Sequence, residues 1–233
     1  SRRGIKVTNT PGVLTEATAD IAMALILMVT RRLAEGERVI RGQKSWQWGM
    51  HYMLGAGIQQ RRLGIIGMGA IGAATARRAR AFGMTIAYTN RSMAGVALER
   101  ELEMERMSLD DLLATSDVVS VHCPSNESTF HLVGAPQFAR MKRTAYLINT
   151  ARGPIVDENA LVAALESGGI AGAGLDVFEH EPAVHSGLVR RDDVVLIPHL
   201  GSATLETRAA MAILAASNAV ALARGGEPLT PVS

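Results

Sequence analysis

The stretch Leu63-Gly64-Ile65-Ile66-Gly67-Met68-Gly69-Ala70-Ile71-Gly72 decides the fold of this chain. Its first four residues form an apolar run that is typical of a buried parallel strand. The glycine pattern G-x-G-x-x-G follows at once, and residues 73–81 then have the composition of a helix. Strand, tight turn and helix in this order are the context that a dinucleotide-binding fingerprint requires. Without that context the pattern would be weak, because glycine-rich turns are common.

Each glycine of the fingerprint has its own expected task. Gly67 makes the tight turn, Gly69 lets the backbone approach a pyrophosphate, and Gly72 lets the helix pack close to the strand. Ala70 and Ile71 lie between them and are expected beside the same ligand. Free N–H groups and the positive end of the helix dipole favour an anion at this place. The stretch therefore predicts a dinucleotide whose pyrophosphate lies on the turn.

The composition is that of a globular protein with little net charge. Of 233 residues, 48% are hydrophobic and 20% are charged, which is typical of a folded chain. The net charge of +2 points to neither nucleic acid nor a lipid surface as a partner. Cys123 is the only cysteine, which excludes an internal disulfide and favours a cytoplasmic location. The longest apolar run, Ile21–Val29, is too short to span a bilayer, and no metal site is expected.

From residue 62 onward, strand-like and helix-like segments alternate. Expected strands lie at 63–67, 84–89, 117–121, 144–149, 171–176 and 193–197, and expected helices at 70–82, 109–115, 135–141, 157–167 and 203–223. The strands carry short apolar runs rather than strict alternation, as expected when both faces of a sheet are covered. The alternation predicts an α/β fold with a doubly wound parallel sheet of the Rossmann type. Asp157 and Gly168 bracket one helix as its cap and its stop.

The segment before the fingerprint predicts a buried helix and an aromatic loop. The helix should begin at Thr15, which can cap it, and run to about Arg41, with Gly36 as a weak point. Its middle, around Ile21–Val29, is apolar nearly all round, which indicates burial between layers or in a subunit interface. Residues 42–60 are either a loop held by its own aromatic residues or an arm that packs on a partner. We expect a two-fold homodimer, the commonest oligomer.

The second expected strand ends without an acidic residue. In NAD-binding units, an Asp or Glu about 20 residues past the glycines accepts hydrogen bonds from the adenosine ribose. Here that position holds Asn90-Arg91-Ser92. A carboxylate would repel a 2′-phosphate, whereas an arginine pairs with it through a planar fork. The pattern favours NADP(H), with NAD(H) left open, and the competing interpretation is that Arg91 is an ordinary solvated loop residue.

Three later segments that follow strands carry candidate catalytic groups. They are residues 149–153, 174–182 and 197–204. In doubly wound sheets the ligand crevice lies outside the carboxyl ends of the strands. The three segments should therefore converge on the edge of the sheet where the cofactor binds, bringing together an arginine, a carboxylate and a histidine.

These three groups can be assigned to the reduction of a 2-keto acid. Such a reaction needs a cation that holds the carboxylate and polarises the carbonyl, and Arg152 can do both. It also needs an acid that protonates the developing alkoxide, and His199 suits that task near neutral pH. A carboxylate beside the histidine orients it and favours its charged form. We choose Glu181 for this position, and the competing assignment places Glu179 or His185 in these roles.

Four motifs in this order resemble the D-isomer-specific 2-hydroxyacid dehydrogenase family. They are the glycine fingerprint, Asn-Thr-Ala-Arg-Gly at 149–153, Asp-Val-Phe-x-x-Glu-Pro at 176–182, and Pro-His-Leu-Gly-Ser-Ala-Thr at 198–204. The resemblance covers nearly the whole chain, and the ordered set of four is highly specific. Within the family, the opening segment 8–20 and the Asn90-Arg91-Ser92 strand end are most similar to glyoxylate/hydroxypyruvate reductases.

The resemblance implies a function and a set of site residues. It implies hydride transfer from NADPH to a small 2-keto acid of the glyoxylate or hydroxypyruvate type, with Arg152, Glu181 and His199 as the catalytic trio. It places Asp176 at the nicotinamide carboxamide. It places the following residues along the cofactor cleft: Cys123, Pro124, Thr129, Thr150, Ala151, His199 and Gly201. It also implies a cofactor domain at 15–202, with remnants of a flavodoxin-like substrate domain at 1–14 and in the C-terminal helix of 203–233.

Two departures from the family pattern stand out. The family commonly carries an arginine where this chain has Ala70, so one phosphate contact is missing. The family chain also begins earlier, with half of a substrate domain and a glycine-containing loop that holds the substrate carboxylate. The sequence is then either a truncation or the ordered part of a longer protein. Two other functions compete: a dinucleotide-binding regulatory module like the corepressors that resemble this family, and an NAD-dependent phosphoglycerate dehydrogenase, which the missing acid disfavours.

Overall fold

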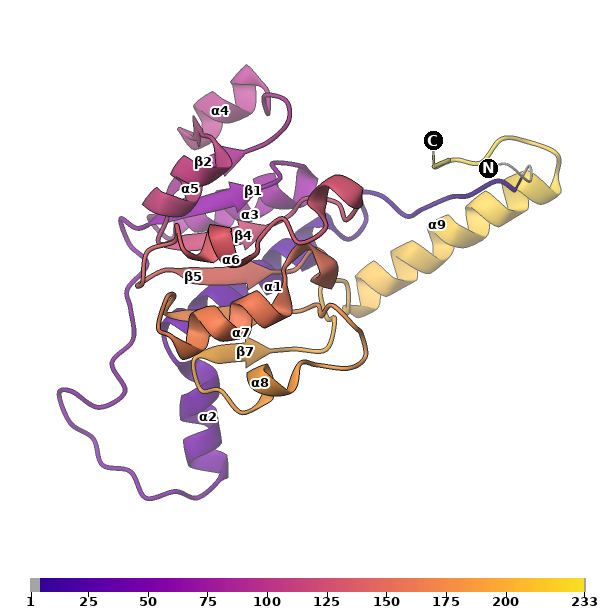
Figure 1. Ribbon diagram of the computed structural model, residues 1–233. Helices are drawn as coiled ribbons and strands as arrows, with labels where there is room; N and C mark the ends of the chain where they lie inside the picture. The colour runs from indigo at the N-terminus through magenta and orange to yellow at the C-terminus, as the bar shows by residue number, and fades with distance from the viewer. Residues whose placement is uncertain (1–4, 233) are drawn as a thin grey trace.

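Seven strands form one parallel sheet in the computed structural model, which describes residues 5–232 (Figure 1). The order across the sheet is β3-β2-β1-β4-β5-β6-β7, and every neighbouring pair is parallel. The strands are β1 (Arg62–Ile66), β2 (Thr85–Thr89), β3 (Glu105–Arg106), β4 (Val118–Val121), β5 (Tyr146–Asn149), β6 (Gly172–Leu175) and β7 (Val194–Leu196). The strand order reverses between β1 and β4, the switch point at which such sheets bind ligands. The doubly wound fold expected from the sequence is confirmed.

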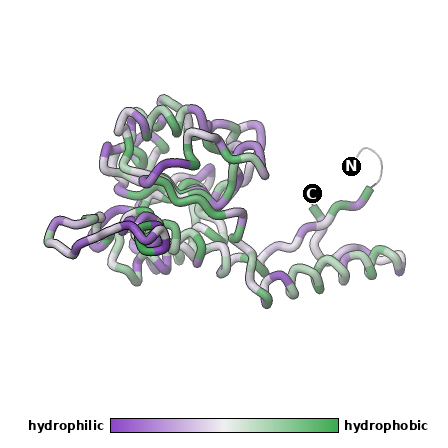
Figure 2. Tube along the Cα trace, turned by 90° about the horizontal axis from the view of Figure 1, so that it is seen from below, coloured by the Kyte–Doolittle hydropathy of each residue, from purple (hydrophilic) through white to green (hydrophobic). Residues whose placement is uncertain are grey.

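Helices cover both faces of the sheet and leave two apolar cores. One core joins α1 and α3 to the sheet, and the other joins α5, α6 and α7 to its opposite face. Figure 2 shows hydrophobic residues along the strands in the middle of the body. The helices are α1 (Thr15–Thr30), α2 (Leu33–Arg41), α3 (Ala70–Ala81), α4 (Val96–Leu102), α5 (Leu109–Thr115), α6 (Ala135–Phe138), α7 (Glu158–Glu166), α8 (Ser186–Val189) and α9 (Leu205–Ala223), with 3-10 turns η1 (Glu127–Thr129) and η2 (Gly153–Ile155).

All the strands and helices expected after residue 62 are present, and their ends differ by a few residues. The Asp157 side chain caps α7 by accepting from the Ala160 N–H at 3.0 Å, and Gly168 after the helix has a φ of +63°. Three short elements were not expected, namely α4, β3 and α8. They were missed because each has few residues and a weak apolar pattern; both residues of β3 are exposed.

The expected helix of residues 15–41 is wrong in two respects. Its N-cap is Leu14, with no side-chain hydrogen bond, so Thr15 does not cap it. It also ends at Thr30 rather than near Arg41, and the expected weak point, Gly36, lies inside the separate helix α2. The Thr30 carbonyl, which a continuing helix would use, accepts instead from the Ala56 N–H at 2.8 Å. Arg32 then takes a left-handed φ of 54°, which breaks the helix.

The apolar middle of α1 is buried within the single chain. Leu25 and Ile26 are fully buried between α3 and the sheet, so burial between layers accounts for the apolar run. The loop after α2 projects from the body in Figures 1 and 2. Trp46 stacks on Tyr52 within this loop, whereas Trp48 is 77% exposed. The aromatic residues therefore stiffen the loop without holding it to the sheet.

Helix α9 projects from the opposite side of the body and ends beside the N-terminal segment (Figure 1). The Asn9 N–H donates to Thr230 O at 3.2 Å, and the Val232 N–H donates to Val7 O at 2.9 Å. Within residues 5–232, α9 is long and apolar enough to cross a membrane by length and composition, which for one helix is weak support. The division into segments 1–14, 15–202 and 203–233 stays a prediction.

Candidate active site

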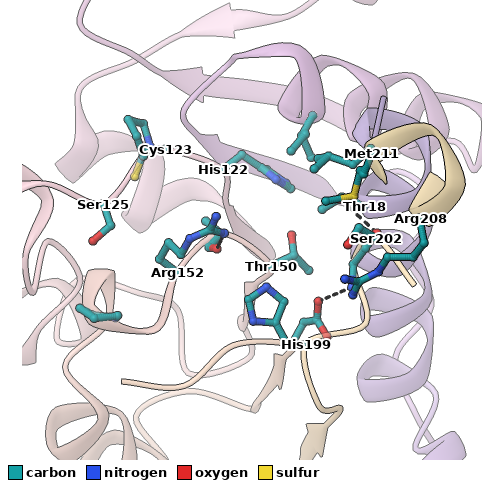
Figure 3. Close-up of a pocket in the computed structure, with 17 residues that line it drawn as sticks. Thr18, His122, Cys123, Ser125, Thr150, Arg152, His199, Ser202, Arg208 and Met211 are labelled. Carbon is teal, nitrogen blue, oxygen red and sulfur yellow. Dashed lines mark hydrogen bonds between the residues drawn. The ribbon is translucent and has the colours of Figure 1, made fainter. Parts of the chain in front are cut away.

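A cavity of about 950 Å³ opens at the carboxyl ends of the central strands (Figure 3). Its walls come from β4, β5 and β6 and from the starts of α1, α3 and α9. The lining residues include Thr18, Ile71, His122, Cys123, Pro124, Thr150, Ala151, Arg152, Asp176, His199, Gly201, Ser202, Arg208 and Met211. A second hollow of about 420 Å³ lies at the ends of β1 and β2 and includes Gly67, Asn90, Arg91 and Thr129. Cys123 and Pro124 line both hollows, which are therefore contiguous.

The three fingerprint glycines differ in what surrounds them. Gly67 has a φ of +99°, and a Cβ there would lie 2.5 Å from the Cys123 nitrogen. A Cβ on Gly72 would lie 2.5 Å from Gly67 O, so α3 can approach β1 only through a glycine. A Cβ on Gly69 would meet nothing within 4 Å. Since no protein atom explains the glycine at 69, this open space and the unpaired first N–H groups of α3 fit a bound pyrophosphate.

His199 lines the cavity and has Glu181 beside it. The His199 Nδ1 atom is 2.9 Å from Glu181 Oε2. The other carboxylate oxygen of Glu181 accepts from the Phe178 N–H at 3.0 Å. Partial burial alone would raise the pKa of Glu181, but the hydrogen bonds from His199 and Phe178 outweigh it and hold the pKa below its usual value. Glu181 is therefore a carboxylate partner for His199.

The backbone around His199 is held by Asp176 at the end of β6. His199 has a left-handed φ of 53°, and its N–H donates to Asp176 O at 2.9 Å. The Asp176 carboxylate accepts from the N–H groups of Leu200 at 2.5 Å and Gly201 at 2.8 Å. Burial raises the pKa of Asp176, although these two hydrogen bonds oppose the shift. Asp176 therefore lines the cavity and also fixes the loop that presents His199.

Arg152 faces the same cavity from the loop after β5 (Figure 3). Asn149 fixes that loop, because its side chain accepts from the Ala151 N–H and donates to Arg152 O, both at 3.0 Å. The guanidinium donates within the described chain only to Ala151 O, at 2.6 Å, which leaves most of its donors for a ligand. Next to it, the buried Thr150 Oγ1 has no hydrogen-bond partner among residues 5–232. Such an atom fits a polar group of a bound ligand.

The competing carboxylate and histidine are engaged elsewhere. Glu179 Oε1 is 2.7 Å from the Nε2 atom of His131. The His185 ring is 3.2 Å from the Asn159 side chain, and its Nδ1 caps α8. Neither residue contacts His199, so the structure brings together Glu181, His199 and Arg152 and leaves Glu179 and His185 apart.

Some cavity residues were missed by sequence reasoning. His122, 2.8 Å from Ser120 Oγ, follows β4, and burial lowers its pKa to about 4. Arg208 and Met211 come from the first turns of α9. The helical spacing from the N-cap Thr204 through 207, 208 and 211 is the signal that could have found them. Of the expected cofactor residues, four line neither hollow: Gly69, Ala70, Gly72 and Ser92.

Comparison with known proteins identifies the family. The profile of the D-isomer specific 2-hydroxyacid dehydrogenase, NAD binding domain, matches residues 23–201. The chain belongs to this family. It is therefore related to oxidoreductases, and the class of cofactor is a nicotinamide dinucleotide. Among residues 5–232, no three His, Cys, Asp or Glu side chains gather in a way that could hold a metal ion.

Curated relatives of this dehydrogenase family member include glyoxylate reductases of archaea. The enzyme of Korarchaeum cryptofilum is 51% identical over 98% of this chain and 69% of its own length. The enzyme of Pyrococcus horikoshii is 47% identical over 100% of this chain and 71% of its own length. The sequence likeness thus extends over α9 as well as the domain that the profile covers.

Solved structures agree with this family assignment. A glyoxylate reductase from Paecilomyes thermophila superimposes with a TM-score of 0.91 at 42% identity, over 99% of this chain and 69% of that one. An NADPH-dependent glyoxylate/hydroxypyruvate reductase from Sinorhizobium meliloti, in complex with NADP and malonate, gives 0.90 at 39% identity, over 100% and 72%.

Proposed function

We propose that this dehydrogenase uses NADPH to reduce a small 2-keto acid of the glyoxylate or hydroxypyruvate type to the 2-hydroxy acid. The observation that carries the proposal is the His199–Glu181 pair, 2.9 Å apart, whose histidine lines the same cavity as Arg152. The names of the archaeal relatives support the substrate class.

The chain's own residues supply binding, orientation and a proton. A bound nicotinamide dinucleotide supplies the hydride. Arg152 holds the substrate carboxylate through two of its parallel N–H groups and polarises the keto oxygen. Because Nδ1 of His199 is taken by Glu181, Nε2 is the ring atom that donates the proton to the developing alkoxide. Glu181 keeps the ring oriented through its contact with Nδ1.

Two parts of the chain hold the dinucleotide. The Gly67–Gly72 turn and the first N–H groups of α3 receive the pyrophosphate, even without the arginine that the family commonly has at Ala70. The Asn90-Arg91-Ser92 turn receives the 2′-phosphate that distinguishes NADP(H) from NAD(H). Arg91 is exposed, and its side chain has no protein partner among residues 5–232. The NADP complex of the Sinorhizobium meliloti relative supports this preference.

A substrate panel assayed with NADPH and NADH tests the proposal. We expect turnover of glyoxylate and hydroxypyruvate, with a lower KM for NADPH than for NADH. Arg91→Ala should weaken NADPH binding by about 1–3 kcal/mol, the scale of a charged hydrogen-bond partner, and leave NADH binding unchanged. No turnover of any 2-keto acid would contradict the proposed reaction. An NADPH affinity that does not depend on Arg91 would contradict the proposed role of Arg91 in binding the 2′-phosphate.

We further propose that the protein is a cytoplasmic homodimer and that the projecting loop after α2 packs on the second subunit. Leu33 and Ile40 of α2 are 51% and 58% exposed, and Trp48 is 77% exposed. Apolar side chains gathered on one projection are typical of an interface. Light scattering at micromolar concentration should give the dimer mass, and Trp48→Ser together with Ile40→Ser should give the monomer mass. A monomer mass for the parent contradicts the proposal.

A further inference from the structure

The turn after β2 is held by an arginine from the edge strand. Arg106 of β3 lies opposite Tyr88 of β2 in the sheet register. Its Nη2 atom donates to the carbonyl oxygens of Asn90 at 3.1 Å and Arg91 at 3.2 Å. Both bonds end on the backbone of the two residues that the proposed function assigns to the 2′-phosphate. The guanidinium therefore fixes the shape of that turn.

Tyr88 fixes the other end of the same loop. Its ring is fully buried in β2, and its hydroxyl accepts from the Ala94 N–H at 3.1 Å. The same hydroxyl donates to the carboxylate of Glu99. Glu99 is the first acidic residue after the turn in the sequence. Tyr88 thus contacts both Ala94 and Glu99, and the loop is fixed at both ends.

The charge of Arg106 is not neutralised by an ion pair within residues 5–232. Its neighbour Glu105 lies 3.9 Å from Arg62 instead. Arg106 and Arg91 therefore place two unpaired guanidinium groups at one edge of the sheet. The two carbonyl oxygens contact only Nη2 of Arg106. The positive charge of the guanidinium therefore still attracts an anion bound at the turn, because the screening length at about 0.1 M salt is roughly 10 Å.

We propose that Arg106 is a positioning residue that holds the Asn90-Arg91 turn ready for the 2′-phosphate and thereby determines the specificity for NADPH over NADH. The proposal rests on the proposed NADPH preference. A turn that is already ordered loses less conformational entropy when it binds, and that gain applies only to the cofactor that contacts it. NADH lacks the phosphate and does not benefit.

The test measures dissociation constants for NADPH and NADH by fluorescence titration, without turnover. Arg106→Ala should weaken NADPH about 5- to 20-fold, the loss of a charge-assisted pair of hydrogen bonds, and leave the NADH constant unchanged. Arg106→Lys should recover part of the affinity, because an ammonium keeps the charge but does not reproduce the position of Nη2 between the two carbonyl oxygens. Arg100→Ala is the matched control, since Arg100 is an exposed arginine of the adjacent α4 whose side chain has no partner in the described chain; it should behave as the parent.

Adenosine 2′-phosphate, measured by competition, should lose affinity in Arg106→Ala as NADPH does, whereas adenosine 5′-phosphate should not. Equal losses for NADPH and NADH, or an Arg100→Ala variant as weak as Arg106→Ala, would overturn the proposal. If Arg106→Ala does not fold, the Arg106→Lys variant decides: unchanged NADPH affinity together with an unchanged NADPH-to-NADH ratio would overturn the proposal, because lysine does not reproduce the bonds of Nη2 to the turn. If Arg91→Ala leaves NADPH binding intact, the NADPH preference itself fails, which is a separate result from failure of Arg106 alone.

Discussion

Replacing Gly69 by alanine should separate cofactor binding from folding. A Cβ at this position meets no protein atom within 4 Å, and Gly69 has a φ of −92° that alanine can adopt. The folded chain should therefore accept the methyl group without strain. The methyl group would instead occupy the space through which the pyrophosphate approaches the backbone.

The expected magnitudes follow from these surroundings. Alanine reduces the freedom of the unfolded chain, which stabilises by about 0.4–1 kcal/mol, but it is a poorer N-cap than glycine, so the two effects nearly cancel. Dinucleotide binding should weaken by about 1–3 kcal/mol, the usual cost of forcing an extra methylene into a packed site. That corresponds to a loss of about 5- to 150-fold in affinity, at about 1.4 kcal/mol for each factor of ten.

Urea unfolding and a cofactor titration on the same variant give both numbers. Gly72→Ala is the matched control, because its Cβ would lie 2.5 Å from Gly67 O and should reduce stability and binding together. The reasoning is refuted if Gly69→Ala folds normally and binds the dinucleotide as tightly as the parent, since the pyrophosphate then does not pass over Gly69. A large loss of stability in Gly69→Ala would refute the claim that no protein atom occupies the space beside Gly69.

Three further predictions concern the catalytic pair, a glycine contact and a half-buried carboxylate. His199→Ala should lower kcat by about 10²- to 10⁴-fold. Glu181→Gln should lower kcat by less, because the ring loses only the carboxylate that orients it, whereas Glu179→Gln, whose native carboxylate contacts His131, should keep the parental kcat, and the reverse pattern would assign Glu179. Gly153→Ala should cost about 1–3 kcal/mol or more of unfolding free energy, because its Cβ would overlap the Phe178 carbonyl; an unchanged urea midpoint contradicts this. Burial would raise the pKa of Asp117, but its hydrogen bonds with the Arg62 N–H and Lys142 outweigh burial and lower the pKa below its usual value. The stability that Asp117 contributes is therefore present above the usual carboxyl pKa and is lost as pH falls through the lower pKa of the folded state. The urea midpoint of Asp117→Asn should depend less on pH in that acid range than that of the parent, and an equal dependence would refute the assignment.

The fold was predictable because its signals are local and repeated. The apolar runs and the glycine turn indicate the order of strand, turn and helix, and the repeated alternation of strands and helices predicts a parallel sheet. The end of α1 was not predictable, because it depends on a hydrogen bond between Thr30 O and the distant Ala56 N–H. Such a contact leaves no periodic signal in the sequence.

The candidate site was predictable only in part, for a similar reason. Arg152, Glu181 and His199 follow strands, and the carboxyl ends of parallel strands share one edge, so topology alone brings them together. The preference for Glu181 over Glu179 needed the structure, because both lie in one loop and only their contacts separate them. Arg208 and Arg106 were missed because each reaches its place from an element whose position the local pattern does not give.

The hydrogen-bonded ends of the chain and α9 form one projecting arm. The N-terminal segment and the C-terminus are hydrogen-bonded to each other far from the sheet, so they move with α9 as one arm. That arm is connected to the body by two stretches of chain, residues 9–14 and 202–204. Next to these stretches, within the body, the Thr18 hydroxyl donates to Gly201 O at 3.1 Å, so both connections leave the body at one place. Arg208 and Met211 line the cavity from the arm, and His199 lines it from the body, so the width of the cavity depends on the angle between arm and body. No residue of α9 lines the hollow at Asn90 and Arg91, which is therefore independent of that angle.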